Sequence, residues 1–224
     1  MMMSNALSIV AVTAVLKDLL ENGLVSDSIT ASVGDVLVTA IPPDLIKVGS
    51  DERAQLNLFL YQVTQNRNVD WISQEFRTRH SSINSSINSI NKSQRSVNPP
   101  LALDLHYLLT AYGAKDFQAE FLLGYAMQLL HKTTIISSEL IGNSLKTAAT
   151  SNTTSLIFQA LAGVSVSALV EQLGQIKLSP EFLNMEDSSK IWSALQTHYR
   201  PSISYQASMV LIESSNVNPS EAVK

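Results

Sequence analysis

The chain of 224 residues contains no cysteine. This absence excludes disulfide bonds, thiolate metal sites and cysteine nucleophiles. Charged residues are also scarce, at 15% of the sequence, compared with roughly 25% in an average soluble domain. A surface with so little charge carries Ser, Thr and Asn instead, or neighbouring subunits cover it. Several strand-like segments are apolar on both faces, which favours partial coverage by neighbours.

Basic clusters and long apolar runs are missing too. Lys and Arg number 15 against 19 Asp and Glu, and no Lys/Arg cluster offsets the net charge of −4, so we expect no nucleic-acid partner. No run reaches the roughly 18 to 20 apolar residues of a membrane span. The N-terminal segment lacks the basic region of a signal peptide. It predicts a helix from Ala6 to Glu21, stopped by Asn22-Gly23 and buried against the core or partly against another subunit.

Catalytic signatures are absent from the sequence. It contains no G-x-S-x-G elbow, dinucleotide fingerprint or Walker loop, and its carboxylates are scattered. Asp104 and His106 stand two residues apart and would share one face of a strand. Such a pair can bind a metal or relay a proton, but it is more commonly a simple hydrogen-bonded pair. We therefore expect no enzyme, cofactor or metal, and keep a small hydrolase built on these two residues as a rival hypothesis.

The clearest positive pattern lies between Pro99 and Gly113, PPLALDLHYLLTAYG. Alternate residues from Leu101 to Leu109 form one continuous apolar face, whereas the intervening residues mix polar and apolar types. Because neighbouring strand residues point to opposite faces, the pattern predicts a central strand. The two prolines mark where its pairing begins.

Other segments add strands and helices around this one. A strand followed at once by an amphipathic helix is typical of an α/β or α+β fold. The helix after the central strand carries an apolar stripe of Phe117, Phe121, Leu122, Tyr125 and Leu129, expected to pack in the core. Strands are expected at Val36–Ile41, Gln55–Val63, Leu173–Leu178 and Ser202–Glu213, helices at Phe117–His131, Glu139–Lys146 and Met185–Gln196, and Leu156–Val170 is compatible with either.

A polar tract interrupts the chain before the central strand. Ser81–Asn98 contains the near-repeat S-S-I-N and too few apolar residues to fold alone. It is either a mobile surface insertion, at about residues 78–98, or a segment that orders against a partner. The polar residues 215–224 are expected to form a flexible tail, which leaves a single domain over residues 1–214.

Four segments together resemble the cap, or tail-terminator, proteins of extracellular, phage-tail-like contractile injection systems. They are SNALSIVAVTAVLKDLL (Ser4–Leu20), LNLFLYQV (Leu56–Val63), PPLALDLHYLLTAYG (Pro99–Gly113) and IWSALQTHYRPSISYQASMVLIES (Ile191–Ser214). The resemblance spans most of the chain outside the Ser/Asn tract and residues 133–170. It implies a mixed β-sheet flanked by helices, as in phage tail terminators.

The resemblance also implies a structural role and no catalytic one. Members of the family assemble as a homo-hexameric ring on the distal end of the inner tube and sheath, stop their polymerisation and anchor the last sheath layer. The implied partners are other copies of the chain, the tube protein and the sheath protein, in a particle assembled in the bacterial cytoplasm and released. The alternative is a baseplate-side or adaptor ring component of the same particle.

Ring contacts are expected from strand edges and strand ends. The candidates are Tyr112 and Lys115, just after the central strand, and His198, Tyr199 and Arg200, which follow the last helix. His198 also suits the C-terminal dipole of that helix, so a capping role remains open for it.

Overall fold

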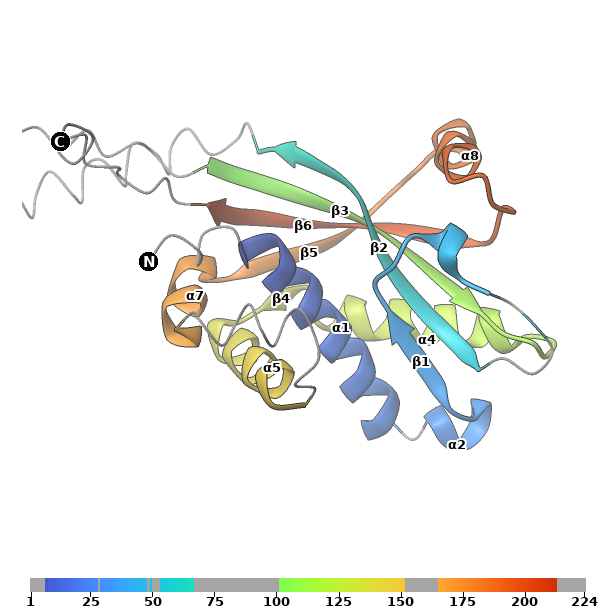
Figure 1. Ribbon diagram of the computed structural model, residues 1–224, viewed down its shortest axis with the longest axis horizontal. Helices are drawn as coiled ribbons and strands as arrows, with labels where there is room; N and C mark the ends of the chain where they lie inside the picture. Colours follow the sequence, from blue (N-terminus) through green and yellow to red (C-terminus); the bar gives the residue numbers. More distant parts are fainter. Residues whose placement is uncertain are drawn as a thin grey trace, which may run out of the picture.

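The computed structural model describes residues 7–27, 29–47, 49, 53–66, 101–151 and 165–212. The Ser/Asn tract, the C-terminal tail and most of Leu156–Val170 lie outside the described residues. The described strands form one mixed sheet, ordered β1-β2-β3-β6-β5-β4 (Figure 1). The pair β1–β2 is parallel and the others are antiparallel, which confirms a mixed sheet. The strands are β1 (Val36–Thr39), β2 (Ala54–Gln65), β3 (Leu101–Tyr112), β4 (Ile135–Ile136), β5 (Ile176–Glu181) and β6 (Ser202–Ile212).

The predicted central strand is β3, between β2 and β6. Every residue of β3 after Leu101 is buried. Leu105, Tyr107 and Leu109 face the helical layer and belong to the hydrophobic core. Both neighbours of β3 are irregular, because the register shifts next to Tyr61 in β2 and opposite Asp104 in β6.

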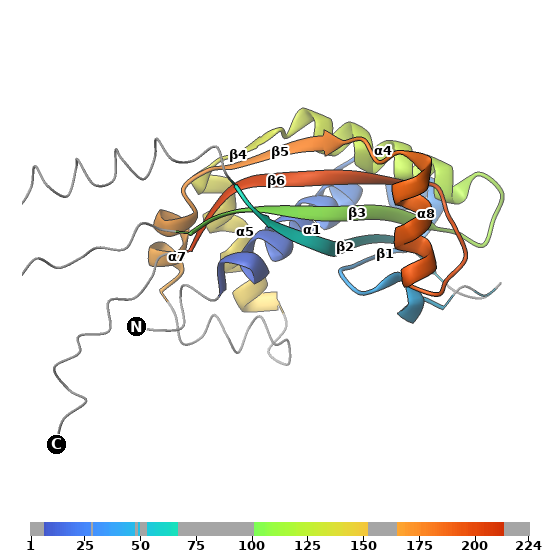
Figure 2. The same ribbon diagram turned by 90° about the horizontal axis from the view of Figure 1, so that it is seen from above.

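Most helices cover one face of the sheet. Figure 2 shows α1, α4 and α5 behind the strands, whereas α8 lies alone in front, across one end of them. Among the described helices, none combines the length and apolar character that crossing a bilayer requires. The helices are α1 (Ser8–Ser26), α2 (Ile29–Val33), α4 (Gln118–Lys132), α5 (Ser138–Ser151), α7 (Val166–Leu173) and α8 (Met185–Ala194), with a 3-10 turn η2 (Pro43–Leu45).

Helix α1 is longer than the sequence predicts. It does not stop at Asn22-Gly23 but continues to Ser26. Gly23 permits a close approach of α4, since a Cβ on it would overlap the Leu129 side chain and lie 2.9 Å from the Tyr125 hydroxyl. Tyr125 then donates a 2.9 Å hydrogen bond to Asp27, just past the end of α1. This glycine therefore serves helix packing and does not end the helix.

A buried tyrosine joins α1 to the centre of the sheet. Tyr107 of β3 is fully buried, and its hydroxyl lies 2.9 Å from Thr13 Oγ1 of α1. Burial raises the pKa of the Tyr107 phenol, whereas the bond to Thr13 acts weakly in the opposite direction. At the N-terminal end of α1, the Ser8 side chain donates to the Leu211 carbonyl of β6. The Gln172 side chain of α7 donates to the same carbonyl. The expected burial of α1 against the core is confirmed.

The apolar stripe expected for α4 is only partly buried. Leu122 and Tyr125 are buried and Leu129 packs against the core, but the side chains of Phe117 and Phe121 are 81% and 49% exposed. The helix begins at Gln118, so Phe117 stands outside it. Assigning both phenylalanines to the core was therefore wrong.

Smaller elements differ from the predicted boundaries. Helix α2 and the two-residue strand β4 have no counterpart in the predicted elements. Strand β5 starts at Ile176 instead of Leu173, because α7 extends to Leu173 and Gly174, with φ 58, ends it. Where it is described, the ambiguous segment 156–170 is the helical start of α7.

Candidate interaction surfaces

A polar network occupies the middle of the sheet face opposite the helical layer. His106 Nδ1 lies 2.8 Å from Glu181 Oε2, and its Nε2 lies 2.8 Å from Thr64 Oγ1. The same Glu181 oxygen accepts from Ser204 at 3.2 Å and from Tyr61 at 3.4 Å. These residues come from β2, β3, β5 and β6, so the network ties four strands together.

Asp104 and His106 share this sheet face, as predicted, but they do not bond to each other. Asp104 Oδ1 accepts a 3.0 Å bond from the Asn66 side chain, whereas His106 pairs with Glu181. The expected hydrogen-bonded pair is therefore wrong in its partner. The bulge in β6 opposite Asp104 breaks the regular register at this point.

The hydrogen bonds of the network join side chains from different strands. Ser204 Oγ bonds to Glu181 and lies 2.9 Å from Tyr61 Oη, so this hydroxyl is directed toward these two groups. Over the ranges that the structure describes, no three His, Asp or Glu side chains gather closely enough to hold a metal ion. The network gives hydrogen-bond partners to polar side chains that are partly or fully buried, and it helps to fix the order of the four strands.

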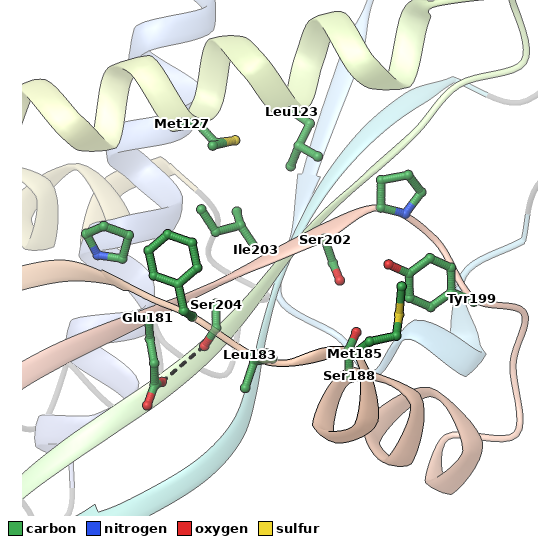
Figure 3. A pocket seen from close by; sticks show the side chains of 13 residues that line it. Leu123, Met127, Glu181, Leu183, Met185, Ser188, Tyr199, Ser202, Ile203 and Ser204 are labelled. Atoms are coloured by element: carbon green, nitrogen blue, oxygen red, sulfur yellow. Dashed lines mark hydrogen bonds between the residues drawn. The ribbon is translucent and has the colours of Figure 1, made fainter.

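An apolar groove of about 410 Å³ lies beside this network, between α4, the end of β5 and α8. Figure 3 shows Leu123 and Met127 reaching down from α4 toward Ile203, with Met185 and Tyr199 on the α8 side. Several of its lining side chains are strongly exposed, namely Phe182 (98%), Met185 (72%) and Tyr199 (53%). Exposed apolar residues gathered around one hollow are typical of a protein-binding site.

The five predicted interface residues lie near the end of β3 and in the segment that follows α8. Tyr112 is buried at the end of β3, and the Arg200 guanidinium lies 5.0 Å above its ring, which brings these two together. Tyr199 packs edge-on against the buried Trp192 of α8 and lines the groove. His198 is exposed beside them.

Lys115 is exposed in the turn between β3 and α4, three residues after Tyr112. Burial raises the pKa of the Tyr112 phenol and outweighs the opposing effects of Thr110 and Arg200. Because Tyr112 is covered within its own chain, it would not touch a partner directly. It would act by holding Arg200 in place above its ring. The interface role of all five remains a prediction.

Part of β2 forms an open strand edge. Strand β1 pairs only with Ala54–Asn57, whereas β3 pairs with β2 as far as Gln65. Among the described residues, the outer edge from Leu58 to Gln65 has no ladder partner. Its backbone groups can therefore accept an added strand.

The sequence reasoning missed the groove and Phe117. Leu123, Met127, Phe182 and Met185 converge only in three dimensions, from helix, strand end and loop. One sequence signal was available for Phe117, since an aromatic residue directly after Lys115-Asp116 stands at a helix start, where its side chain need not face the core.

Comparison with known proteins identifies a family and several similar solved structures. The family described as the Pvc16 N-terminal domain matches residues 11–223. No curated protein sequence matches the chain. The chain is similar to a sheath/tube terminator of the PVC extracellular contractile injection system in its extended state, with a TM-score of 0.42 and 14% identity over 86% of this chain and 56% of that one.

It is also similar to the tube-terminating cap of the anti-feeding prophage, with a TM-score of 0.43 and 14% identity. That match covers 87% of this chain and 54% of the cap chain. The present chain thus spans a little over half the length of either of these two proteins.

Proposed function

Because the chain belongs to the Pvc16 N-terminal domain family, we propose that it is a structural cap of a contractile injection system. It forms a ring on the distal end of the inner tube and sheath, ends their polymerisation and anchors the last sheath layer. The observation that carries this proposal is the family match over residues 11–223. The resemblance of four sequence segments to cap proteins supports the same structural role.

Two structural features support a role in assembly. The outer edge of β2 from Leu58 to Gln65 offers backbone groups to a strand of a neighbouring copy or of the sheath. The groove beside α4 offers apolar surface, lined by Leu123, Met127 and Met185. A protein that works by contact uses such surfaces in place of a pocket with catalytic groups.

The proposed partners are other copies of the chain, the tube protein and the sheath protein. Six copies form the ring, assembly takes place in the bacterial cytoplasm, and the cap stays on the particle when it is released. The role requires no catalysis, so we propose that the chain is not an enzyme.

Deleting the gene tests the role directly. Loss of a cap leaves tube and sheath assembly without a stop, so electron microscopy should show overlong or unstable sheaths, and a plasmid copy should restore uniform length. Loss of a baseplate-side ring component should instead leave no particles, and that result would favour the alternative. Particles of unchanged length and stability would contradict both.

A further inference from the structure

Helix α8 stands apart from the other helices. Figure 1 shows it away from the helical layer, and Figure 2 shows it crossing one end of the strands. Within its ten residues, only Ser188 and Trp192 are buried. A helix this short is marginally stable by itself, so its packing against the sheet decides how firmly it is held.

Polar side chains do not tie α8 to the sheet. Its ion pairs are internal, since Lys190 Nζ lies 2.6 Å from Glu186 Oε1 and 4.0 Å from Asp187 Oδ1. Across the described part of the chain, no hydrogen bond or ion pair joins a side chain of α8 to another helix or strand. The attachment of α8 therefore depends on Trp192 and the contacts around it.

Trp192 attaches the helix at a cost, because its indole N–H is buried without an acceptor. The side chain is 3% exposed, and Nε1 has no hydrogen-bond partner in the described structure. A buried donor without a partner loses the hydrogen bonds that water would give it, and exposure of the group removes this penalty. The closed position of α8 thus combines favourable aromatic burial with an unsatisfied polar group.

Both ends of α8 are capped by residues of the same segment. At its start, the Asn184 side chain accepts a 2.8 Å bond from a backbone N–H of the first turn. At its end, Gln196 has φ 52 and donates its N–H to the Ser193 carbonyl at 3.1 Å. The Thr197 N–H lies 3.5 Å from the Trp192 carbonyl. Because these caps need no group of the sheet, α8 can leave the sheet without first breaking backbone bonds to another element.

The segment after α8 carries two contacts that hold it closed. Tyr199 packs edge-on against Trp192, with ring centroids 6.0 Å apart. Arg200 lies 5.0 Å above the Tyr112 ring at the end of β3. Each of these contacts is weak on its own, so together they fasten the segment reversibly.

We propose that α8 and its flanking segments, residues 182–200, form a flap that opens as one unit while the six-stranded sheet stays folded. Opening separates the Trp192 indole from the sheet, gives its N–H access to water and uncovers the Tyr112 ring. This end of the sheet thus has two surfaces, the polar outer side of α8 when the flap is closed and an aromatic one when it is open. Neither the flap nor the cap role requires the other.

Hydrogen exchange followed by NMR tests the flap on the full chain. Once detached, a helix of ten residues unfolds rapidly, so its amides exchange together with the indole N–H. The Trp192 indole N–H and the α8 amides should show the same protection, at least about 100-fold below that of the amides of β3 and α5. Their exchange should depend little on urea, because a local opening exposes little surface. Trp71→Phe identifies the indole signal of the other tryptophan.

Two results would contradict a flap. If the α8 amides exchange quickly but the indole N–H is as protected as β3, the helix frays in place. If α8 and the indole N–H exchange only at urea concentrations that also open β3, the helix is part of the same cooperative unit as the sheet.

Arg200→Gln tests what holds the flap closed. It removes the contact with the Tyr112 ring, so the protection of α8 and of the Trp192 indole N–H should fall about two- to fivefold, with β3 and α5 unchanged. Arg53→Gln makes the same replacement at an exposed ion pair with Asp35 and is the matched control, which should leave α8 as it was. Unchanged protection of α8 in Arg200→Gln, or an equal loss in β3, would overturn the proposal.

Discussion

Asn57 acts as an additional rung between β1 and β2. Its side chain is fully buried, and its amide oxygen accepts from the Ile41 N–H at 3.1 Å while its amide nitrogen donates to the Ile41 carbonyl at 3.0 Å. Thr39 adds a 2.8 Å bond to the same oxygen. Strand β1 ends at Thr39, so this amide continues the pairing two residues further.

Replacing this amide should destabilise the fold. Asn57→Asp keeps the shape but sets a carboxylate oxygen against the Ile41 carbonyl, and a buried group that loses its partner costs about 1–3 kcal/mol, more when charged. We expect the free energy of unfolding, measured in urea, to fall by about 3 kcal/mol. Asn143→Asp, on the exposed surface of α5, is the matched control and should change it by less than about 0.5 kcal/mol. Equal effects would contradict the role given to Asn57.

At the scale of elements, two helical glycines differ in what surrounds them. Gly23 of α1 faces Leu129 and Tyr125 of α4, whereas a Cβ on Gly124 of α4 would meet nothing within 4 Å. Alanine stabilises a helix interior by about 1 kcal/mol relative to glycine. That gain is available in full only where no neighbour must move.

Alanine at these two positions should therefore have different effects. Gly124→Ala should raise the free energy of unfolding by about 0.5–1 kcal/mol. Gly23→Ala should give no gain, because its methyl group must displace Leu129 and disturb the Tyr125–Asp27 bond. Thermal unfolding of the two variants side by side provides the measurement, and an equal rise in both would show that α1 and α4 are not closely packed at Gly23.

These elements also show how far the sequence predicts the fold. The strand pattern of Leu101–Leu109 and the helical stripe of α4 reflect local periodicity, so both elements could be located. The continuation of α1 through Gly23 depends on a neighbouring helix, which no local pattern encodes. The groove could not be predicted for the same reason, because Leu123, Met185 and Tyr199 are distant in sequence and meet only after folding.

At the scale of the whole molecule, tyrosines with raised phenol pKa values lie both in the sheet and in the helical layer. Burial raises the phenol pKa of five of them, and for Tyr125, whose hydroxyl also bonds to Asp27, the value reaches about 12. The five are Tyr61, Tyr107, Tyr112, Tyr125 and Tyr205. They lie on β2, β3, β6 and α4, so their ionisation affects the sheet and the helical layer together.

The fold should therefore lose stability at alkaline pH. Below pH 10 these phenols are protonated in the folded and the unfolded chain, and their contribution is fully present. Between about pH 10 and 12 the unfolded chain releases its protons first, so the free energy of unfolding falls as pH rises. Melting temperature against pH, with absorbance at 295 nm to follow ionisation, should show the fall. Tyr125→Phe should lessen it, and an unchanged melting temperature up to pH 12 would contradict the expectation.

Strand β3 has a consequence for how the gene can change over time. It is buried from Ala102 to Tyr112 and paired on both sides, so inserting or deleting one residue would turn its remaining side chains to the wrong face against both neighbours at once. Such length changes in descendants should be purged within β3. They should accumulate instead in connections such as Leu195–Arg200, where no ladder fixes the count.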